Sequence, residues 1–200
     1  AAVAAKAGIE QQKNSTRDKL DEYTRLVIGK YEQSINRLLG DFHAGFNITK
    51  TEHGYPGGVA SSSYQILING TPVDLGDDKT PLDKPSFRNT LSAGDKSTLA
   101  LAFFLAQLEQ DPDRASKIVI FDDPFNSQDN FRKDHTVRKV RDCGESCAQV
   151  IILSHDPYFL KRIWERLQDR AADRKSLELR RLGLLNTAIL EWDVEAATQG

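Results

Sequence analysis

The sequence is poor in cysteine, in long apolar runs and in net charge. Two cysteines among 200 residues cannot form the disulfide framework of a small secreted domain, so we expect a reducing, cytoplasmic location. The longest apolar run, Leu99–Ala106, is far shorter than the roughly 18 residues of a membrane span, and no membrane partner is expected. Lys and Arg number 27 against 29 Asp and Glu, which excludes a polybasic surface but leaves a local basic groove open. The sequence also contains no methionine, not even at its start, and we expect a piece of a longer protein.

Hydrophobic periodicity divides the chain near residue 40. Residues 1–40 carry apolar side chains at intervals of three and four between charged ones, which predicts one long helix. The stripe consists of Leu20, Tyr23, Val27, Tyr31, Ile35 and Leu38. It fits a coiled-coil arm or a helix docked on a domain, and its length does not separate the two.

Residues 41–200 are predicted to form an α/β domain. Alternating apolar and polar residues between Phe42 and Leu75, with an Asn69-Gly70 turn, predict a small antiparallel patch. Farther on, helices alternate with short apolar strands, and two more strands close the chain. The helices are expected at 91–110, 131–143 and from Pro157, and the strands at 117–121, 149–153, 177–182 and 188–192. This alternation predicts a partly parallel sheet flanked by helices, with the strands at 117–121 and 149–153 buried.

Two adjacent carboxylates, Asp122 and Asp123, follow the strand at 117–121. The carboxyl end of a strand is where open α/β sheets bind ligands. Neighbouring side chains on a strand point to opposite faces, so one carboxylate can hold a hard cation such as Mg²⁺ while the other orients a water molecule. The alternative is a strand that simply runs into a turn at Pro124.

Three polar residues, Ser154, His155 and Asp156, follow the strand at 149–153. A right-handed crossover through the intervening helix makes the two strands near neighbours, so His155 is expected to share one rim with both carboxylates. Ser154 or Asp156 is also placed to cap the helix that begins at Pro157. Capping does not account for the histidine.

A third motif lies at the start of the helix at 91–110 and consists of Ser92, Gly94 and Asp95. Ser92 and Asp95 are spaced as a variant capping box, which accounts for both of them structurally. Gly94 is not explained by capping, because glycine weakens the first turn of a helix. A glycine permits close backbone approach, and a helix N-terminus with a serine hydroxyl suits an anion such as phosphate.

In this order, these motifs resemble the carboxyl-terminal lobe of an ABC-type ATPase head, a P-loop NTPase fold. Leu91–Asp95 resembles the ABC signature, Ile118–Asp122 the Walker B strand, Asn126–Asp129 the D-loop and His155 the switch histidine. The residue sequence of these motifs is most similar to that of the ATPase domains of RloC- and PrrC-type anticodon nucleases, which are relatives of SMC and RecF-like ATPases. In such proteins a coiled coil separates two lobes. Residues 1–40 then correspond to a coiled-coil stub and 41–200 to the second lobe, with its motifs at 91–156.

The resemblance implies ATP hydrolysis with Mg²⁺ in a sandwich dimer of two complete heads. It implies that Asp122 holds the metal, that Asp123 polarises the attacking water and that His155 senses the γ-phosphate. This sequence departs from most ABC ATPases by having Asp123 where they have glutamate.

Three further positions match residues that act across the dimer. The resemblance implies that Ser92 and Gly94 contact the γ-phosphate held by the other head, and that Asp129 bridges the two heads.

The phosphate-binding motif G-x-x-x-x-G-K-S/T does not occur in the chain. The resemblance places it in the first lobe of the same protein, which becomes an expected partner beside the second head. The chain alone is then expected to be inactive. In the full protein, ATP would gate an activity on tRNA or DNA, such as tRNA cleavage, DNA repair or phage defence. The rival hypotheses are a non-catalytic binding lobe with relic nucleotide motifs, and a nuclease whose centre lies outside these residues.

Overall fold

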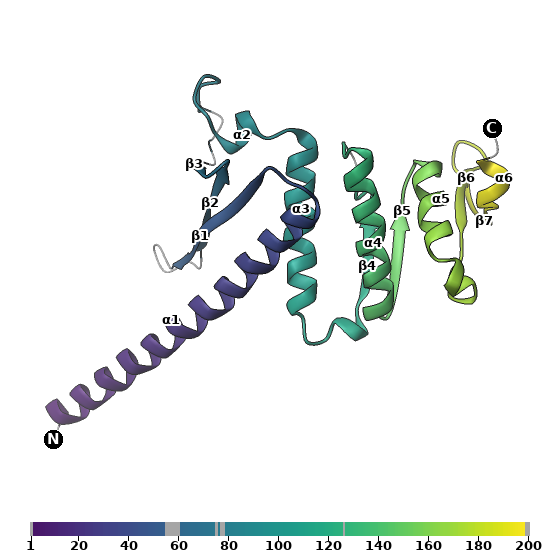
Figure 1. Ribbon diagram of the computed structural model, residues 1–200. Coiled ribbons are helices and arrows are strands. Elements are labelled where there is room, and N and C mark those ends of the chain that lie inside the picture. The colour runs from purple at the N-terminus through teal and green to yellow at the C-terminus, as the bar shows by residue number, and fades with distance from the viewer. Residues whose placement is uncertain (1, 55–60, 75, 77–78, 126, 199–200) are drawn as a thin grey trace. The chain divides into compact units, whose positions relative to one another are not determined.

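The computed structural model describes residues 2–54, 61–74, 76, 79–125 and 127–198 (Figure 1). The chain divides into two compact units, Ala1–Gln110 and Asp111–Gly200. Parallel and antiparallel strands both occur, in separate sheets, so the mixed α/β class predicted from the sequence is confirmed. No helix in the described part of the chain is both long enough and apolar enough to cross a membrane.

The first unit opens with the long helix that the sequence predicted, α1 (Ala2–Asp41). Only its last turns are packed: Ile35, Leu38 and Leu39 are buried, whereas Tyr23 farther upstream is 66% exposed. The carboxyl-terminal part of the helix is therefore docked on the domain, and the upstream part of its apolar stripe faces solvent.

The predicted antiparallel patch is present as a sheet in the order β1-β2-β3. Its strands are β1 (Phe46–Gly54), β2 (Ser61–Ile68) and β3 (Thr71–Val73). Asn69 and Gly70 form the two-residue turn between β2 and β3, and both have the positive φ that such hairpin turns require. Ile48 and Ile66, which are register partners, are buried on the face that forms the core of this unit.

Two helices complete the first unit, α2 (Phe87–Thr90) and α3 (Ala93–Gln110). α3 packs against α1 and buries Leu99, Ala102 and Leu105. Arg37 of α1 pairs with Glu109 of α3 at 2.5 Å, which ties the ends of the two helices together.

Asn36 joins α1 to the edge of the sheet. Its Nδ2 donates to the carbonyl of Ile48 at 2.8 Å, and its Oδ1 accepts from the N–H of the same residue at 2.8 Å. The carboxamide thus satisfies both backbone groups of Ile48, as a neighbouring strand would. Glu32, one turn earlier, accepts from the N–H of Thr51 at 3.0 Å.

The second unit is built around a parallel pair of strands, β4 (Ile118–Asp122) and β5 (Gln149–Leu153). Helix α4 (Asn130–Ser146) connects them, and α5 (Pro157–Arg166) follows β5. The remaining elements are the short helices η2 (Arg114–Ser116), η3 (Gln168–Asp173) and α6 (Val194–Ala197) and the strands β6 (Leu177–Arg181) and β7 (Thr187–Glu191). The predicted helix–strand order is therefore confirmed, with boundaries shifted by a few residues.

The prediction that the parallel strands are buried is wrong for one of their two faces. Val119 and Phe121 of β4 are buried, but Ile118 and Ile120 are 60% and 57% exposed. On β5, Ile151 and Leu153 lie on the same open face and are also exposed. Alternation along a strand sends successive side chains to opposite faces, and the described helices of the second unit cover only one of these faces.

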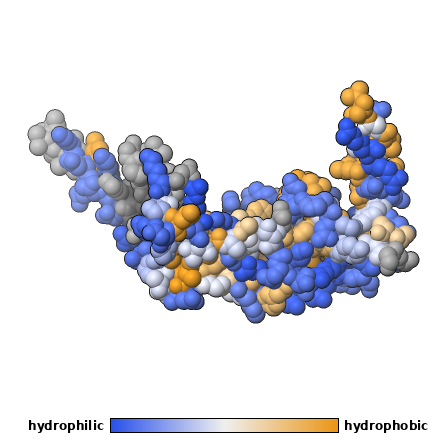
Figure 2. All heavy atoms as spheres, turned by 90° about the horizontal axis from the view of Figure 1, so that it is seen from above, coloured by the Kyte–Doolittle hydropathy of each residue, from blue (hydrophilic) through white to orange (hydrophobic). Residues whose placement is uncertain are grey.

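The two last strands form a separate antiparallel hairpin, in which Leu179 lies opposite Ile189. Its apolar side chains are largely exposed, up to 96% for Leu185 in the connecting loop. Figure 2 shows these side chains as orange spheres along the hairpin.

Replacing Asn36 by alanine tests the junction between α1 and β1. Asn36→Ala leaves both backbone groups of Ile48 without their partner, so the free energy of unfolding should fall by about 1–3 kcal/mol. Urea denaturation measures the change. Gln33→Ala, at an exposed position one turn away, is the control and should cost no more than about 0.5 kcal/mol. Equal losses in the two variants would show that the carboxamide is not an anchor.

Candidate functional site

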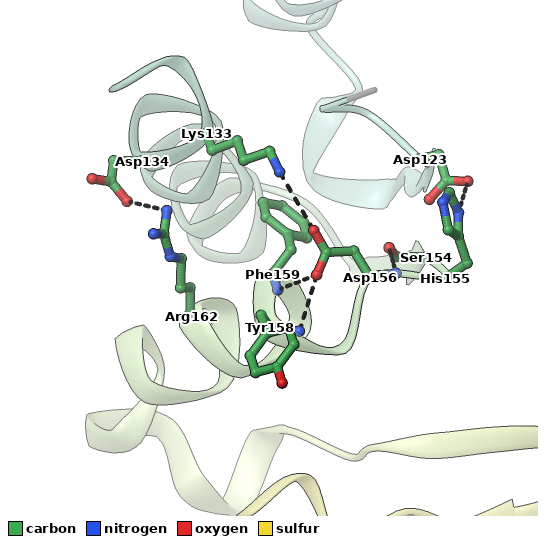
Figure 3. Close-up of polar contacts among 9 residues, drawn as sticks. All are labelled: Asp123, Lys133, Asp134, Ser154, His155, Asp156, Tyr158, Phe159 and Arg162. Atoms are coloured by element: carbon green, nitrogen blue, oxygen red, sulfur yellow. Dashed lines mark hydrogen bonds and ion pairs between the residues drawn. The ribbon is translucent and has the colours of Figure 1, made fainter. Parts of the chain in front are cut away.

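The carboxyl ends of β4 and β5 lie level with each other, because Asp122 is the register partner of Leu153. The loops that leave the two strands therefore start side by side. His155 Nδ1 lies 2.8 Å from Asp123 Oδ2, and Asp123 N–H donates to the carbonyl of Leu153 at 3.0 Å (Figure 3). The predicted meeting of Asp123 and His155 at one rim of a parallel sheet is confirmed.

Asp123 occupies an unusual backbone position for a residue with a side chain. Its φ is 43°, in the left-handed region, where non-glycine residues are uncommon and tend to occur at functional sites. Its second carboxylate oxygen, Oδ1, is buried and accepts no hydrogen bond from a described residue. Burial acts to raise the pKa of Asp123, but the side chains of His155 and Ser154 outweigh it, so the pKa lies below its usual value. The site therefore holds an ionised carboxylate whose second oxygen is enclosed by the protein and has no hydrogen-bond partner among the described residues.

The loop that carries His155 is fixed on both sides of the histidine. Asp156 N–H donates to Ser154 Oγ at 2.9 Å, which closes a tight turn around His155. Asp156 Oδ1 caps α5 by accepting from the N–H groups of Tyr158 and Phe159, as the sequence predicted. The side chain of His155 is 81% exposed, so its position depends on this loop and on Asp123.

Asp156 has a second partner, Lys133, on the first turn of α4. The Nζ of Lys133 lies 3.4 Å from Asp156 Oδ2. Burial acts to raise the pKa of Asp156, but the backbone donor of Phe159 and the ammonium group of Lys133 outweigh it and hold the pKa below its usual value.

Asp122 ends strand β4 and is exposed. In the described part of the chain, no cluster of three or more His, Cys, Asp or Glu residues could hold a metal ion by itself. A single carboxylate nevertheless fits Mg²⁺, which keeps several waters and is often bound through one or two carboxylates plus the phosphates of a substrate. Of the two carboxylates at this rim, Asp122 is the one exposed to a hydrated Mg²⁺ that arrives with a nucleotide, because Asp123 Oδ1 is buried.

The segment matched to the D-loop is described except for Asn126, which lies outside the described residues. Asp129 caps α4 by accepting from the N–H of Arg132 at 2.9 Å, and its side chain is 61% exposed. The preceding Gln128 is buried and bonds through Oε1 to the hydroxyl of Thr136 at 2.9 Å. The D-loop segment is thus attached to the first two turns of α4.

Ser92, Gly94 and Asp95 lie in the first unit, at the start of α3. Ser92 Oγ donates to Asp95 Oδ2 at 2.7 Å and accepts from the N–H of Asp95 at 3.1 Å. The N–H of Ser92 also donates to that carboxylate at 3.1 Å, so the predicted capping box is confirmed. Ser92 is exposed and Gly94 is buried. A phosphate contact through Ser92 remains a prediction.

The contacts of Lys133, Gln128 and Thr136 were not predicted from the sequence, although Gln128 lies in the segment matched to the D-loop. Lys133 and Asp156 are 23 positions apart, and a lysine in the first turn of a helix looks like any solvated cation. No sequence pattern indicates that Gln128 bonds to Thr136.

The chain matches the AAA domain family over residues 82–189, just over half of its length. No curated protein matches its sequence. Among solved structures, one described as concerning ATP-driven dimerization and DNA-stimulated activation of SMC ATPases is 14% identical, with a TM-score of 0.57. The match covers 90% of this chain and 93% of that one.

Two Smc head domains give a similar result. The head from Pyrococcus yayanosii, with a coiled coil and joint, has a TM-score of 0.61 at 15% identity, covering 96% of this chain and 32% of that one. The head from Pyrococcus furiosus, with an extended coiled coil and bound to the C-terminal domain of ScpA, has a TM-score of 0.63 at 13% identity. That match covers 98% of this chain and 43% of the other, so this chain spans less than half the length of either Pyrococcus head.

At such low identities the structural likeness shows the fold, and the family match shows the family. The family match includes both Asp123 and His155. This chain belongs to the AAA domain family, and its fold is similar to that of part of an SMC ATPase head.

Proposed function

We propose that this chain is the carboxyl-terminal lobe of an ABC-type head that binds and hydrolyses ATP with Mg²⁺. The observation that carries the proposal is the hydrogen bond between Asp123 Oδ2 and His155 Nδ1 at the carboxyl edge of the parallel strands. Ligands of open α/β sheets bind at this edge. The order and residue sequence of the motifs support the proposal that the chain is related to the RloC- and PrrC-type anticodon nuclease ATPases.

The two paired side chains have distinct tasks in this proposal. Mg-ATP supplies the phosphoryl group and the metal that offsets its charge. Asp123 holds His155 through Oδ2, and its carboxylate would orient the attacking water once the complete head exposes Oδ1, which is buried in this chain. The ring of His155 is largely exposed and would contact the γ-phosphate through the ring nitrogen that does not face Asp123. Asp122 would hold the metal through a water molecule.

The exposed apolar face of the parallel strands supports the existence of a partner lobe that covers it. Parallel sheets are covered on both faces in nearly all proteins, yet Ile118, Ile120, Ile151 and Leu153 are exposed here. A first lobe of the same protein that covers this face would also supply the phosphate-binding loop that the sequence lacks. The exposed upstream part of α1, within residues 1–40, would continue into a coiled coil that joins the lobes.

A second head is the other proposed partner. Ser92 and Gly94 would meet the γ-phosphate held by that head, and the exposed carboxylate of Asp129 would bridge the two heads. Splitting one site between two heads makes dimerisation the switch for hydrolysis. In the full protein this switch would gate an activity on tRNA or DNA.

Adding the first lobe to this chain tests the division of the site. The chain alone lacks the amide donors, lysine and hydroxyl of the phosphate loop, and each charge-assisted hydrogen bond is worth ~1.5–3 kcal/mol. Loss of a few such bonds removes most of the roughly 8 kcal/mol of a micromolar affinity, so calorimetry should show a Kd for Mg-ATP weaker than ~1 mM. With the first lobe present, tight binding should return, and turnover should rise more steeply than linearly with protein concentration. Micromolar binding to the bare chain would mean that the nucleotide site lies elsewhere.

Replacing Asp123 by asparagine in the complete head tests the chemistry at the rim. The amide still fills the space but cannot accept a proton or carry the charge that orients water, so kcat should fall by about 100-fold or more while ATP binding is retained. Steady-state phosphate release and equilibrium nucleotide binding measure the two effects. Asp83→Asn, at an exposed loop position, is the control and should leave both unchanged. If wild-type heads bind ATP without hydrolysing it, the chain is a binding lobe with relic motifs.

A further inference from the structure

We propose that Lys133 is a positioning residue that joins the start of helix α4, where Asp129 lies, to the loop that presents His155 to Asp123. The inference deepens the proposed function and rests on it for its catalytic consequence. Lys133 touches neither Asp123 nor His155 through any contact in the structure, so it would act through Asp156. Figure 3 shows the arrangement, with Lys133 and Asp156 pointing toward each other across the two elements.

Asp156 transmits the position of Lys133 to the histidine. Its Oδ2 faces Lys133 Nζ at 3.4 Å, and its Oδ1 is fixed by the first turn of α5. Its backbone N–H holds Ser154 Oγ at 2.9 Å, on the other side of His155. A shift of Asp156 therefore moves the turn on which His155 sits.

Lys133 also lies over the aromatic contact between the loop after β4 and the first turn of α5. Its Nζ lies 5.4 Å from the ring centroid of Phe125, two residues after Asp123. The ring of Phe125 lies against that of Phe159 on α5, and both rings are buried. A cation over an aromatic ring is attracted to it, and the attraction is stronger where water is excluded. Lys133 thus contacts the loop after β4 and the loop after β5 at once.

The backbone links Lys133 to Asp129. The N–H of Lys133 donates to the carbonyl of Asp129 at 2.9 Å, so the two residues belong to the same first turn of α4. Gln128 is held to Thr136 one turn farther along. Any displacement of the D-loop by a second head would move this turn as a unit, and the ion pair would pass the displacement to Asp156.

The ion pair between Lys133 and Asp156 is partly shielded from solvent, which strengthens the attraction between its charges. The side chains of Lys133 and Asp156 are only 26% and 28% exposed, in contrast to most ion pairs on this chain. Arg162 and Asp134 form a matched control, because they join the same two helices at 3.3 Å with side chains 42% and 62% exposed. Asp134 directly follows Lys133, but its partner lies on the middle of α5, away from the turn around His155.

The test compares variants of both pairs in the full-length protein. Lys133→Gln and Asp156→Asn remove the ion pair, and asparagine keeps an oxygen that can cap α5. Each should lower kcat for ATP by about fivefold with the ATP affinity unchanged, since the proposed function assigns neither side chain a contact with the nucleotide. The double variant should be no slower than either single one, Lys133→Arg should keep most of the activity, and Arg162→Gln should match wild type.

A second readout does not depend on ATPase activity. With ¹⁵N-labelled histidine, the ring signals of His155 should shift in Lys133→Gln and Asp156→Asn but not in Arg162→Gln. If no variant and no wild-type protein hydrolyses ATP, the proposed function fails, and the histidine signals alone decide this inference. Unchanged His155 signals in Lys133→Gln would overturn it. Equal effects of Lys133→Gln and Arg162→Gln on kcat would also overturn it. So would a kcat of the double variant that falls by the product of the two single-variant decreases.

Discussion

The parallel pairing of β4 with β5 is the constraint on which the rest of the site depends. Because both strands end at the same level, the residue after Asp122 and the second residue after Leu153 come within hydrogen-bond distance. Helices α4 and α5 then begin close to this rim, with N-caps at Asp129 and Asp156. An antiparallel pairing of the same strands would have sent Asp123 and His155 to opposite ends of the sheet.

The same pair of strands is the basis of the proposed partner lobe. One face of the pair is covered by helices, but the other carries exposed isoleucine and leucine side chains. The rim on this sheet offers a carboxylate pair and a histidine, and the sequence contains no G-x-x-x-x-G-K-S/T loop for phosphates. In the proposed function, one additional lobe with a phosphate-binding loop would both cover the exposed face and supply the loop. The proposed division of the active site thus rests on packing as well as on chemistry.

Local patterns were enough to predict the order of elements, the antiparallel patch, the caps at Ser92 and Asp156, and the meeting of Asp123 with His155. Each depends on periodicity or on residues next to a strand end. Contacts between distant residues, such as Lys133 with Asp156 or Asn36 with Ile48, leave no pattern in a single sequence. The exposed face of β4 was missed for another reason: an apolar strand predicts that both faces are buried, but not which chain buries them. The assigned roles of all six site residues stay predictions: Ser92, Gly94, Asp122, Asp123, Asp129 and His155.

A crystal structure of the complete head with Mg²⁺ and a slowly hydrolysed ATP analogue would show whether nucleotide binds at the rim of β4 and β5. The γ-phosphate should lie within hydrogen-bond distance of a ring nitrogen of His155, with a water molecule at the Asp123 carboxylate in line for attack. Ser92 of the second head should meet the same phosphate. A nucleotide bound where neither Asp123 nor His155 can reach its γ-phosphate would contradict the proposed division of the site.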